Sequence, residues 1–192
     1  MPGEAIGRRR RGYGNFAALK PGIYAPLESR LSDFDPGFAG TLAFGEYTSE
    51  NFSWGIEFSN LNTDFDNGSQ KNEISANSAK LILTWIKPFG RKRNRKWEIY
   101  LNIGGGIYFV DLEGAGSVVS GKESDEVYGV EVGLGGNFNL SKRFYLGLEG
   151  KYIYTTDVEV FQPVVDKFSL QGYEILGSIG VRFNFFRIFR SR

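Results

Sequence analysis

The sequence contains no cysteine and no histidine. Without cysteine the chain has no disulfide, thiolate metal site, iron–sulfur cluster or cysteine nucleophile. Without histidine it lacks the commonest general base, the Ser-His-Asp triad and most zinc sites. The formal net charge is only +1, from 23 basic and 22 acidic residues, so the whole chain has no bias toward nucleic acid or anionic membranes. These shortages exclude many enzyme classes and leave any electrostatic role to local clusters.

A long apolar run is also missing. No segment of the 192 residues approaches the roughly 18–20 consecutive apolar residues that cross a bilayer as a helix, and the mean hydropathy is -0.27. A transmembrane helix is therefore excluded. Residues 1–12 include four arginines, Arg8 to Arg11, but no apolar core or cleavage site of a secretory signal. We expect this segment to be a disordered, solvated tail rather than a contact for nucleic acid or anionic lipid.

Glycine and aromatic residues are abundant instead, with 26 Gly, 17 Phe and 10 Tyr. From Gly14 onward, apolar residues alternate with polar or small ones in eight stretches bounded by turn residues, which predicts strands. Their connections alternate between short and long, which is typical of an antiparallel up-and-down meander with all long loops at one end. We expect one barrel over 13–186, a tail over 187–192, and a monomer. The eight predicted strands are 16–24, 37–47, 52–62, 74–86, 97–112, 126–139, 144–156 and 168–186.

The two faces of each predicted strand differ in side-chain size. In the last strand, one face carries Tyr173, Ile175 and Ile179, whereas the other carries Glu174 and Arg182 with glycine and serine. A soluble, ligand-carrying barrel would place the apolar face inside. Five or more large residues from each of eight strands would overfill so narrow an interior, however. The apolar face must then point outward, where only lipid can cover it. The sequence thus predicts an all-β, eight-stranded antiparallel transmembrane barrel.

Aromatic residues gather near the short-turn ends of the predicted strands, although the ordinary β-propensity of aromatic residues could also explain them. Such rings straddle the headgroup region of a bilayer. We expect a membrane-interface girdle of Phe44, Tyr47, Trp54, Trp85, Trp97, Phe144, Phe183 and Phe185.

The face assigned to the interior carries four cations and five anions. Counting from the short turns, we expect most of them in one layer, with Glu149 beside Arg182 and with Lys151 and Glu131 completing the local neutralisation. Such a layer predicts a polar, plugged core. It could instead be a switchable gate in a narrow pore, but the plugged core is favoured. The predicted network comprises Lys20, Glu57, Lys80, Glu98, Glu131, Glu149, Lys151, Glu174 and Arg182.

Three other motifs are weaker. Residues 62–73 place oxygen ligands as a calcium loop would, but Asn62 replaces the first acid and Asn67 the turn glycine, so we expect a solvated loop and no metal or cofactor. Gly104–Gly106 is not followed by a phosphate-binding motif, and we expect bulky neighbours to lean over it. The turn 91–96 is basic and could contact anionic headgroups, although a solvated turn is favoured; no nucleic-acid partner is expected.

Four segments carry a resemblance to a known family: 16–26, 38–45, 102–108 and the closing strand Gly180-Val-Arg-Phe-Asn-Phe185. The chain resembles the OmpA-type small outer-membrane barrels, and the closing strand resembles their C-terminal assembly signal, although residues 186–192 continue past its terminal aromatic. The resemblance implies location in the bacterial outer membrane, contact with outer-membrane lipid and lipopolysaccharide, and insertion by the barrel-assembly machinery.

The same resemblance implies a structural or loop-mediated interaction role rather than catalysis. It also implies no anchoring to the cell wall, because no peptidoglycan-binding domain follows the barrel. A small pore or solute channel gated by the interior charges is the main alternative. A lipid-modifying hydrolase is disfavoured, because the lipid A deacylases of this architecture use a His-Ser pair and the sequence has no histidine.

Overall fold

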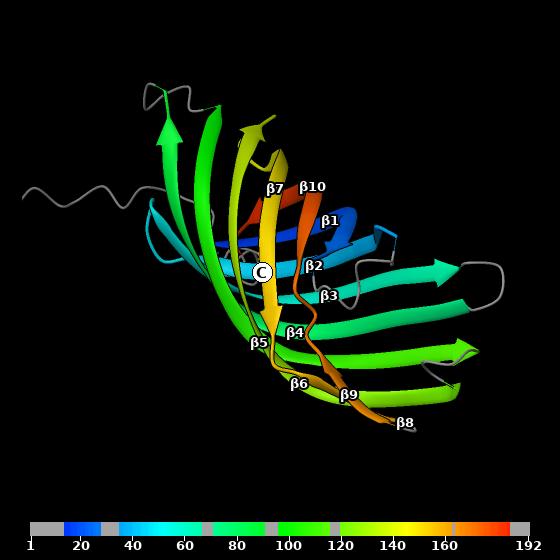
Figure 1. The fold of residues 1–192 in the computed structure, drawn as a ribbon. Helices are drawn as coiled ribbons and strands as arrows, with labels where there is room; N and C mark the ends of the chain where they lie inside the picture. Colours follow the sequence, from blue (N-terminus) through cyan, green and yellow to red (C-terminus); the bar gives the residue numbers. More distant parts are fainter. Residues whose placement is uncertain are drawn as a thin grey trace, which may run out of the picture.

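The chain folds into a closed antiparallel barrel of eight strands (Figure 1). The computed structural model describes residues 14–27, 35–66, 71–90, 96–115, 120–162 and 164–184. A separate two-stranded sheet lies in the connection that precedes the last barrel strand. The barrel strands are β1 (Asn15–Pro26), β2 (Gly37–Tyr47), β3 (Phe52–Asp66), β4 (Lys71–Phe89), β5 (Trp97–Ala115), β6 (Ser120–Asn139), β7 (Phe144–Thr155) and β10 (Gly172–Phe183); the separate sheet is β8 (Val158–Gln162) with β9 (Val164–Phe168).

Each barrel strand pairs with its neighbours in the chain, and β1 closes the barrel by pairing with β10 from Asn15↔Phe183 to Pro26↔Gly172. Closure leaves no open edge around the barrel wall, so the backbone groups there are paired between strands. In the short turn after β6, the Leu140 N–H donates to the Phe144 carbonyl at 3.0 Å, so the two strands keep their apolar residues on the same face. The all-β, eight-stranded up-and-down architecture predicted from the alternation is therefore confirmed.

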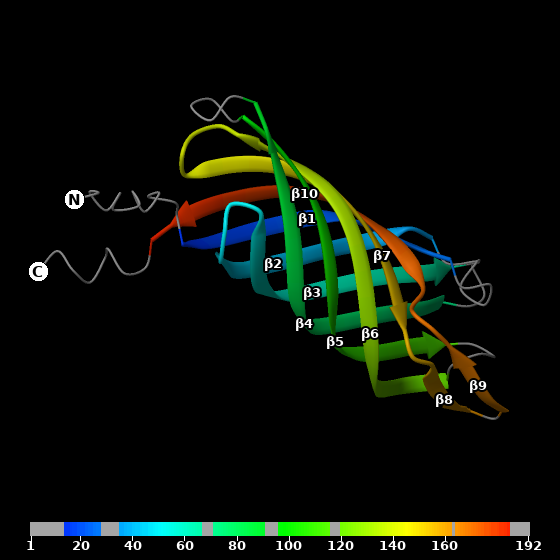
Figure 2. The same cartoon turned by 90° about the vertical axis from the view of Figure 1, so that its left-hand side faces the viewer.

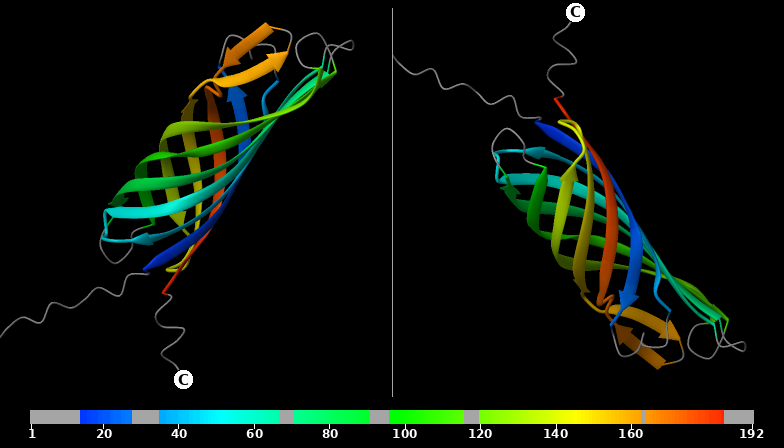
Figure 3. Two further views of the ribbon diagram at one scale, coloured as in Figure 1. Left: turned by 90° about the horizontal axis from the view of Figure 1, so that it is seen from below. Right: turned by 90° about the horizontal axis from the view of Figure 1, so that it is seen from above.

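The start of β1 and the end of β10 lie side by side at one end of the barrel (Figure 3). We call this the short-turn end; it also carries the connections 48–51, 90–96 and 140–143. The opposite end, which we call the long-loop end, carries the connections 27–36, 67–70, 116–119 and 156–171. The predicted tails, 1–12 and 187–192, lie outside the described residues.

Strands β3 to β6 are longer than the sequence predicted. Residues 63–73 and 113–125 were expected to be loops, but β3 continues to Asp66, β4 begins at Lys71, β5 ends at Ala115 and β6 begins at Ser120. Their polar residues suggested loop because an apolar face was taken as the mark of a strand. A sheet beyond the bilayer needs no apolar outer face, and these four strands project past the rest of the barrel (Figure 2).

The connection between β7 and β10 also differs from the prediction. It contains the β8–β9 hairpin, and β10 begins at Gly172 rather than at Phe168, which belongs to β9. The chain is tied back to the barrel between them, because the Leu27 N–H donates to the Gln171 carbonyl at 2.8 Å and the Leu170 side chain is fully buried. The hairpin is therefore attached to the long-loop end of the barrel.

Glycine on the inner face makes room for large neighbours. A Cβ at Gly180 would overlap the ring of Tyr145, and a Cβ at Gly104 would overlap the end of Ile82. The narrow interior can thus hold rings and long charged side chains because the strands opposite them are bare.

Candidate functional site

Large apolar side chains cover the outside of the barrel on all eight strands. Leu134 and Ile103, for example, are 62% and 61% exposed, which is unusual for aliphatic side chains at the centre of strands. A continuous surface of this kind far exceeds the few hundred Å² of apolar patch found on soluble monomers. We call it the lipid belt, and its central residues are Leu19, Ile23, Leu42, Ile56, Leu81, Leu83, Ile99, Leu101, Ile103, Val130, Val132, Leu134, Leu146, Leu148, Ile175 and Ile179.

The short-turn edge of the belt carries most of the predicted girdle. Phe44, Trp54, Trp85, Trp97 and Phe144 are exposed on the outer face, and the Trp97 ring packs against Phe138 with ring centroids 4.7 Å apart. Phe183 is half-buried, and Phe185 lies outside the described residues.

The placement of Tyr47 in the girdle is wrong. Its side chain points into the barrel, where its hydroxyl accepts a hydrogen bond from Arg182 Nε at 3.0 Å. The reason is strand parity, because Tyr47 shares the inner face of β2 with the buried Thr41 and Ala43. Position near a strand end was taken as evidence of outward direction, which only the alternation decides.

A second aromatic row at the other edge of the belt was missed. The rings of this row point outward, and the Tyr128 side chain is 69% exposed. The rings of Tyr152 and Tyr173 contact each other with their centroids 5.4 Å apart. The alternation of large and small residues could have shown it, because each ring continues the apolar face of its strand. The exposed members are Phe38, Phe58, Phe109, Tyr128, Tyr154 and Tyr173. Beyond this row the outer face becomes polar, as at the Asn60–Asn77 hydrogen bond.

A buried network of charged side chains crosses the middle of the interior. Lys151 is its centre: Nζ lies 2.5 Å from Glu57 and 2.9 Å from Glu131, with Glu149 at 3.8 Å. Lys80 makes a second ion pair with Glu131 at 2.6 Å. Strands β3, β4, β6 and β7 contribute these side chains, so the network links distant parts of the barrel wall. Burial makes such pairs costly to break, because the remaining partner keeps an unpaired charge.

Lys20 of β1 joins the network from the other side. Its Nζ lies 2.5 Å from Glu57 and 2.8 Å from Glu149. Glu149 also accepts hydrogen bonds from Tyr100 at 3.2 Å and from the Asn102 amide. Six of the nine predicted interior charges therefore form one connected group, which we call the central network: Lys20, Glu57, Lys80, Glu131, Glu149 and Lys151.

The predicted neighbourhood of Glu149 and Arg182 is wrong. Glu149 is opposite Leu176 in the β7–β10 register, so Arg182 lies six residues further along β10, or about 20 Å nearer the short-turn end. Arg182 instead binds Glu98 at 2.5 Å and donates to Asn139 at 2.7 Å. Its guanidinium also lies 4.9 Å from the centre of the Tyr145 ring. Alternation assigned Arg182 to the correct face but could not give its height.

Glu174 lies near the central network without joining it. Its side chain is 1% exposed, and neither carboxylate oxygen has a hydrogen-bond partner within the part of the chain that the structure describes. Lys151 is directly opposite it on β7, but the ammonium group points toward Glu57 and Glu131. The inner layer thus contains three lysines and four glutamates, and Glu174 is the glutamate left over.

We expect Glu174→Gln to change the free energy of unfolding by less than about 1 kcal/mol, or to raise it, because the change removes a buried charge that has no partner. Glu149→Gln should lower the free energy of unfolding by about 3–5 kcal/mol, because it removes one carboxylate partner from each of the buried Lys20 and Lys151 ammonium groups. Equilibrium urea titration of the detergent-refolded variants measures both. Equal losses for the two variants would show that Glu174 is paired as tightly as Glu149.

Apolar side chains fill the interior at the long-loop end. Every barrel strand contributes at least one, and Val158 and Leu170 add two from the segment around the β8–β9 hairpin; both are fully buried. A polar core was predicted, although the alternation that places Glu57, Glu98 and Glu174 inside also places Leu61, Leu112 and Leu176 there. This apolar plug consists of Tyr24, Ala39, Leu61, Ile74, Ala76, Tyr108, Val110, Leu112, Val127, Ile153, Val158, Leu170 and Leu176.

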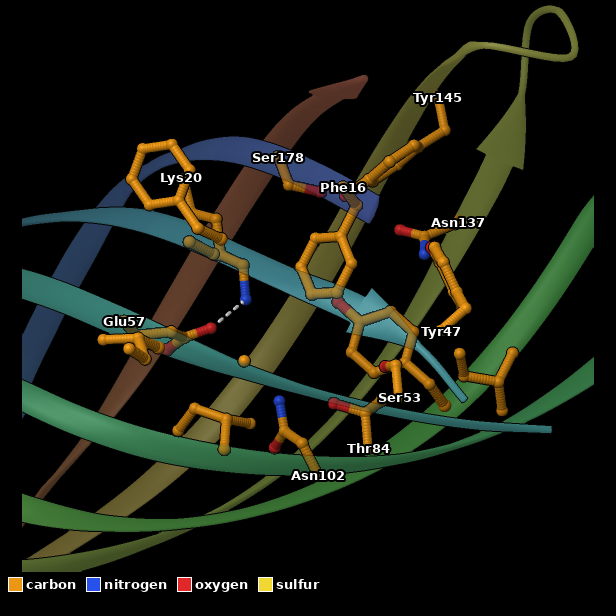
Figure 4. Close-up of a pocket in the computed structure, with 17 residues that line it drawn as sticks. Phe16, Lys20, Tyr47, Ser53, Glu57, Thr84, Asn102, Asn137, Tyr145 and Ser178 are labelled. Atoms are coloured by element: carbon orange, nitrogen blue, oxygen red, sulfur yellow. Dashed lines mark hydrogen bonds and ion pairs between the residues drawn. The ribbon is translucent and has the colours of Figure 1, made fainter. Parts of the chain in front are cut away.

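A small cavity of about 50 Å³ lies on the other side of the central network (Figure 4). Lys20 and Glu57 border it at one side, and Tyr47 and Tyr145 also line it. Its small size and the polar groups in its mixed lining suit a few water molecules rather than an organic ligand. No cluster of three or more acidic side chains that could hold a metal ion occurs among the described residues, which include 62–66 and 71–73 of the segment considered for calcium.

Comparison with solved structures identifies the fold. Neisserial surface protein A has a TM-score of 0.64 at 13% identity, with 88% of this chain and 97% of that chain covered. OprG of Pseudomonas aeruginosa has a TM-score of 0.57 at 14% identity, covering 90% and 97%. Ail, the attachment invasion locus protein of Yersinia pestis, has a TM-score of 0.50 at 18% identity, covering 88% and 99%. The fold is that of the small outer-membrane β-barrels.

No protein-family model matches the chain, and no curated protein matches its sequence. Among the described residues, no helix is long and apolar enough to cross a membrane. The lipid belt and the fold together place this small outer-membrane barrel in the bacterial outer membrane, as the sequence predicted.

Proposed function

We propose that this outer-membrane barrel is closed to solutes and acts through its long-loop end, in a structural or binding role rather than in catalysis. The observation that carries the proposal is the apolar plug, to which all eight barrel strands contribute. Water and ions cross an apolar constriction poorly because the constriction dewets. The lack of histidine and cysteine supports a role without catalysis.

The central network supports closure for a second reason. Its side chains satisfy one another across the interior rather than lining an open path, and Lys80, Glu131 and Lys151 have fully buried side chains. Charged groups in this arrangement hold the wall together and leave little room for a hydrated ion. We therefore assign the network a structural role.

The outer face of the projecting strands is the candidate surface for a partner. Asp64, Glu73 and Glu113 are directly opposite one another on β3, β4 and β5, and all three are exposed. Ail is known in complex with the heparin analogue sucrose octasulfate. An acidic row of this kind disfavours such a polyanion here, so a binding role in this protein would need a different class of partner.

Lipid surrounds the barrel in this proposal. Outer-membrane lipid and lipopolysaccharide contact the belt, and the barrel-assembly machinery inserts the chain by way of the closing strand near Gly180–Phe183, with the protein remaining a monomer. The exposed apolar residues on all eight strands support full lipid contact without a protein interface.

Recording from planar bilayers tests closure. We expect wild-type protein to give no discrete single-channel openings, and quenching of its tryptophans by brominated lipid will show that it has inserted. Discrete openings whose conductance changes on Glu149→Gln or Arg182→Gln would instead support the alternative, a pore gated by the interior charges.

A further inference from the structure

We propose that the short-turn end carries a binding surface for anionic phospholipid headgroups, formed by Lys87, Lys96, Lys142 and Arg143. We call these four residues the cationic arc. All four are exposed, and each lies next to an exposed aromatic residue of the belt edge or within two residues of one. This inference does not depend on whether the barrel conducts ions.

Lys87 is the member that faces lipid from within a strand. It lies on the outer face of β4 between Trp85 and Phe89, and its Nζ is 5.8 Å from the centre of the Phe89 ring. A lysine in this position lays its methylene stem along apolar surface and extends its ammonium group to the headgroups. Its charge is therefore held at the depth of the lipid phosphates.

The other three cations continue the arc along the rim. The Lys96 carbonyl accepts a hydrogen bond from the Asn139 N–H at 2.7 Å, so Lys96 adjoins the turn that contains Lys142 and Arg143. The Arg143 carbonyl accepts from the Arg182 N–H at 2.7 Å, which fixes that turn against β10. The arc thus runs from the end of β4, at Lys87, past the start of β5, at Lys96, to the turn between β6 and β7, which carries Lys142 and Arg143.

Aromatic rings beneath the arc set its depth. Trp97 packs on Phe138 directly below Lys96, and Phe144 follows Arg143. Tryptophan and phenylalanine at a belt edge mark the boundary between acyl chains and headgroups. Cations just outside that boundary meet phosphate rather than bulk water, and an anionic leaflet attracts them.

Among the residues that the structure describes, the β2–β3 side of the rim has the opposite sign. Glu46 and Glu50 are exposed at the β2–β3 connection, and Trp54 is directly opposite Glu46 in the register. At the far end of the barrel the exposed outer face carries the acidic row of Asp64, Glu73 and Glu113. The positive surface is therefore local, although the chain has almost no net charge.

The three tryptophans allow a direct test, because Trp97 reports on the arc and Trp54 on the acidic side of the rim. Two single-tryptophan proteins, one with Trp54→Phe and Trp85→Phe and one with Trp85→Phe and Trp97→Phe, are refolded into phosphatidylcholine vesicles. Brominated phosphatidylglycerol or brominated phosphatidylcholine is then added as quencher. In low salt, we expect brominated phosphatidylglycerol to quench Trp97 about fivefold more effectively than brominated phosphatidylcholine. High salt should remove this preference, and Trp54 should be quenched equally by the two lipids.

Matched charge changes locate the effect. Lys87→Gln, Lys96→Gln, Lys142→Gln and Arg143→Gln together should lower the preference at Trp97 to about half, because the adjoining turn still carries Arg91, Lys92, Arg93 and Arg95. Four neutralisations at the other end, Asp64→Asn, Glu73→Gln, Glu113→Gln and Glu126→Gln, should leave it unchanged. Heat-modifiable migration on an SDS gel confirms that each protein is folded. If the fourfold variant fails to fold, the double variant Lys142→Gln with Arg143→Gln replaces it, because both residues lie in a turn. The proposal would be overturned by equal quenching of Trp97 by both lipids, or by a preference at Trp97 that is the same with and without the four neutralisations of the arc.

Discussion

Lys151→Met is expected to lower the free energy of unfolding of the barrel by about 3–5 kcal/mol. The substitution keeps the length and most of the volume of the side chain, so the loss reports charge rather than packing. It leaves Glu57 and Glu131 buried with one lysine partner each instead of two, Lys20 for Glu57 and Lys80 for Glu131. Equilibrium urea titration in detergent gives the value.

A double-mutant cycle shows whether the loss belongs to the network. Glu131→Gln combined with Lys151→Met should cost less than the two separate losses added, with a coupling of about 0.5–3 kcal/mol. Glu149→Gln with Arg182→Gln is the matched control, because these side chains belong to different clusters and should be additive. Additivity for Lys151 and Glu131 would contradict the contact between them.

Leu134→Arg is expected to destabilise the bilayer-refolded barrel by about 2–4 kcal/mol, because it places a charge on the lipid face near mid-membrane. Leu134 is outward on β6, and its neighbours across the strands are Leu101 and Gly150, also on the belt. The side chain therefore has no route to water except along the outside of the barrel.

Glu126→Arg is the control for Leu134→Arg, since Glu126 lies on the same face of the same strand but at the edge of the belt, opposite Phe109 of the second aromatic row. It should change stability by no more than about 0.5 kcal/mol, as surface substitutions do. Unfolding titrations in lipid vesicles compare the two variants. Equal tolerance of arginine at both positions would mean that the face around Leu134 does not meet lipid.

The barrel and its two faces could be predicted because they follow from two properties of the sequence. Period-2 alternation assigns each residue to a face, and the small volume inside eight strands decides which face is the inner one. Glu57, Glu149 and Lys151 needed no further information to be placed inside. Tyr47 could have been assigned by the same rule, since it alternates with the outward Phe44 and Glu46.

Heights within the barrel could not be predicted in this way. Alternation gives direction but not the stagger of one strand against another, and that stagger decides that Arg182 meets Glu98 of β5 across the interior rather than Glu149. The apolar plug depends in part on the same information, because Val158 and Leu170 come from a connection that folds back into the barrel mouth. The ends of β3 to β6 that lie beyond the bilayer could not be predicted either. Both faces of a strand can be polar in water, so the alternation of apolar and polar residues that indicates a strand is absent there.

The most direct test of a transmembrane barrel with its apolar face outward is refolding from urea with and without detergent. We predict that the chain folds only when micelles or vesicles are present, and that the unheated, folded protein migrates differently from the boiled protein on an SDS gel. The lipid belt requires this result, since 62% of Leu134 and 61% of Ile103 would otherwise face water. A folded, monodisperse monomer in detergent-free buffer, with the same migration before and after boiling, would contradict it.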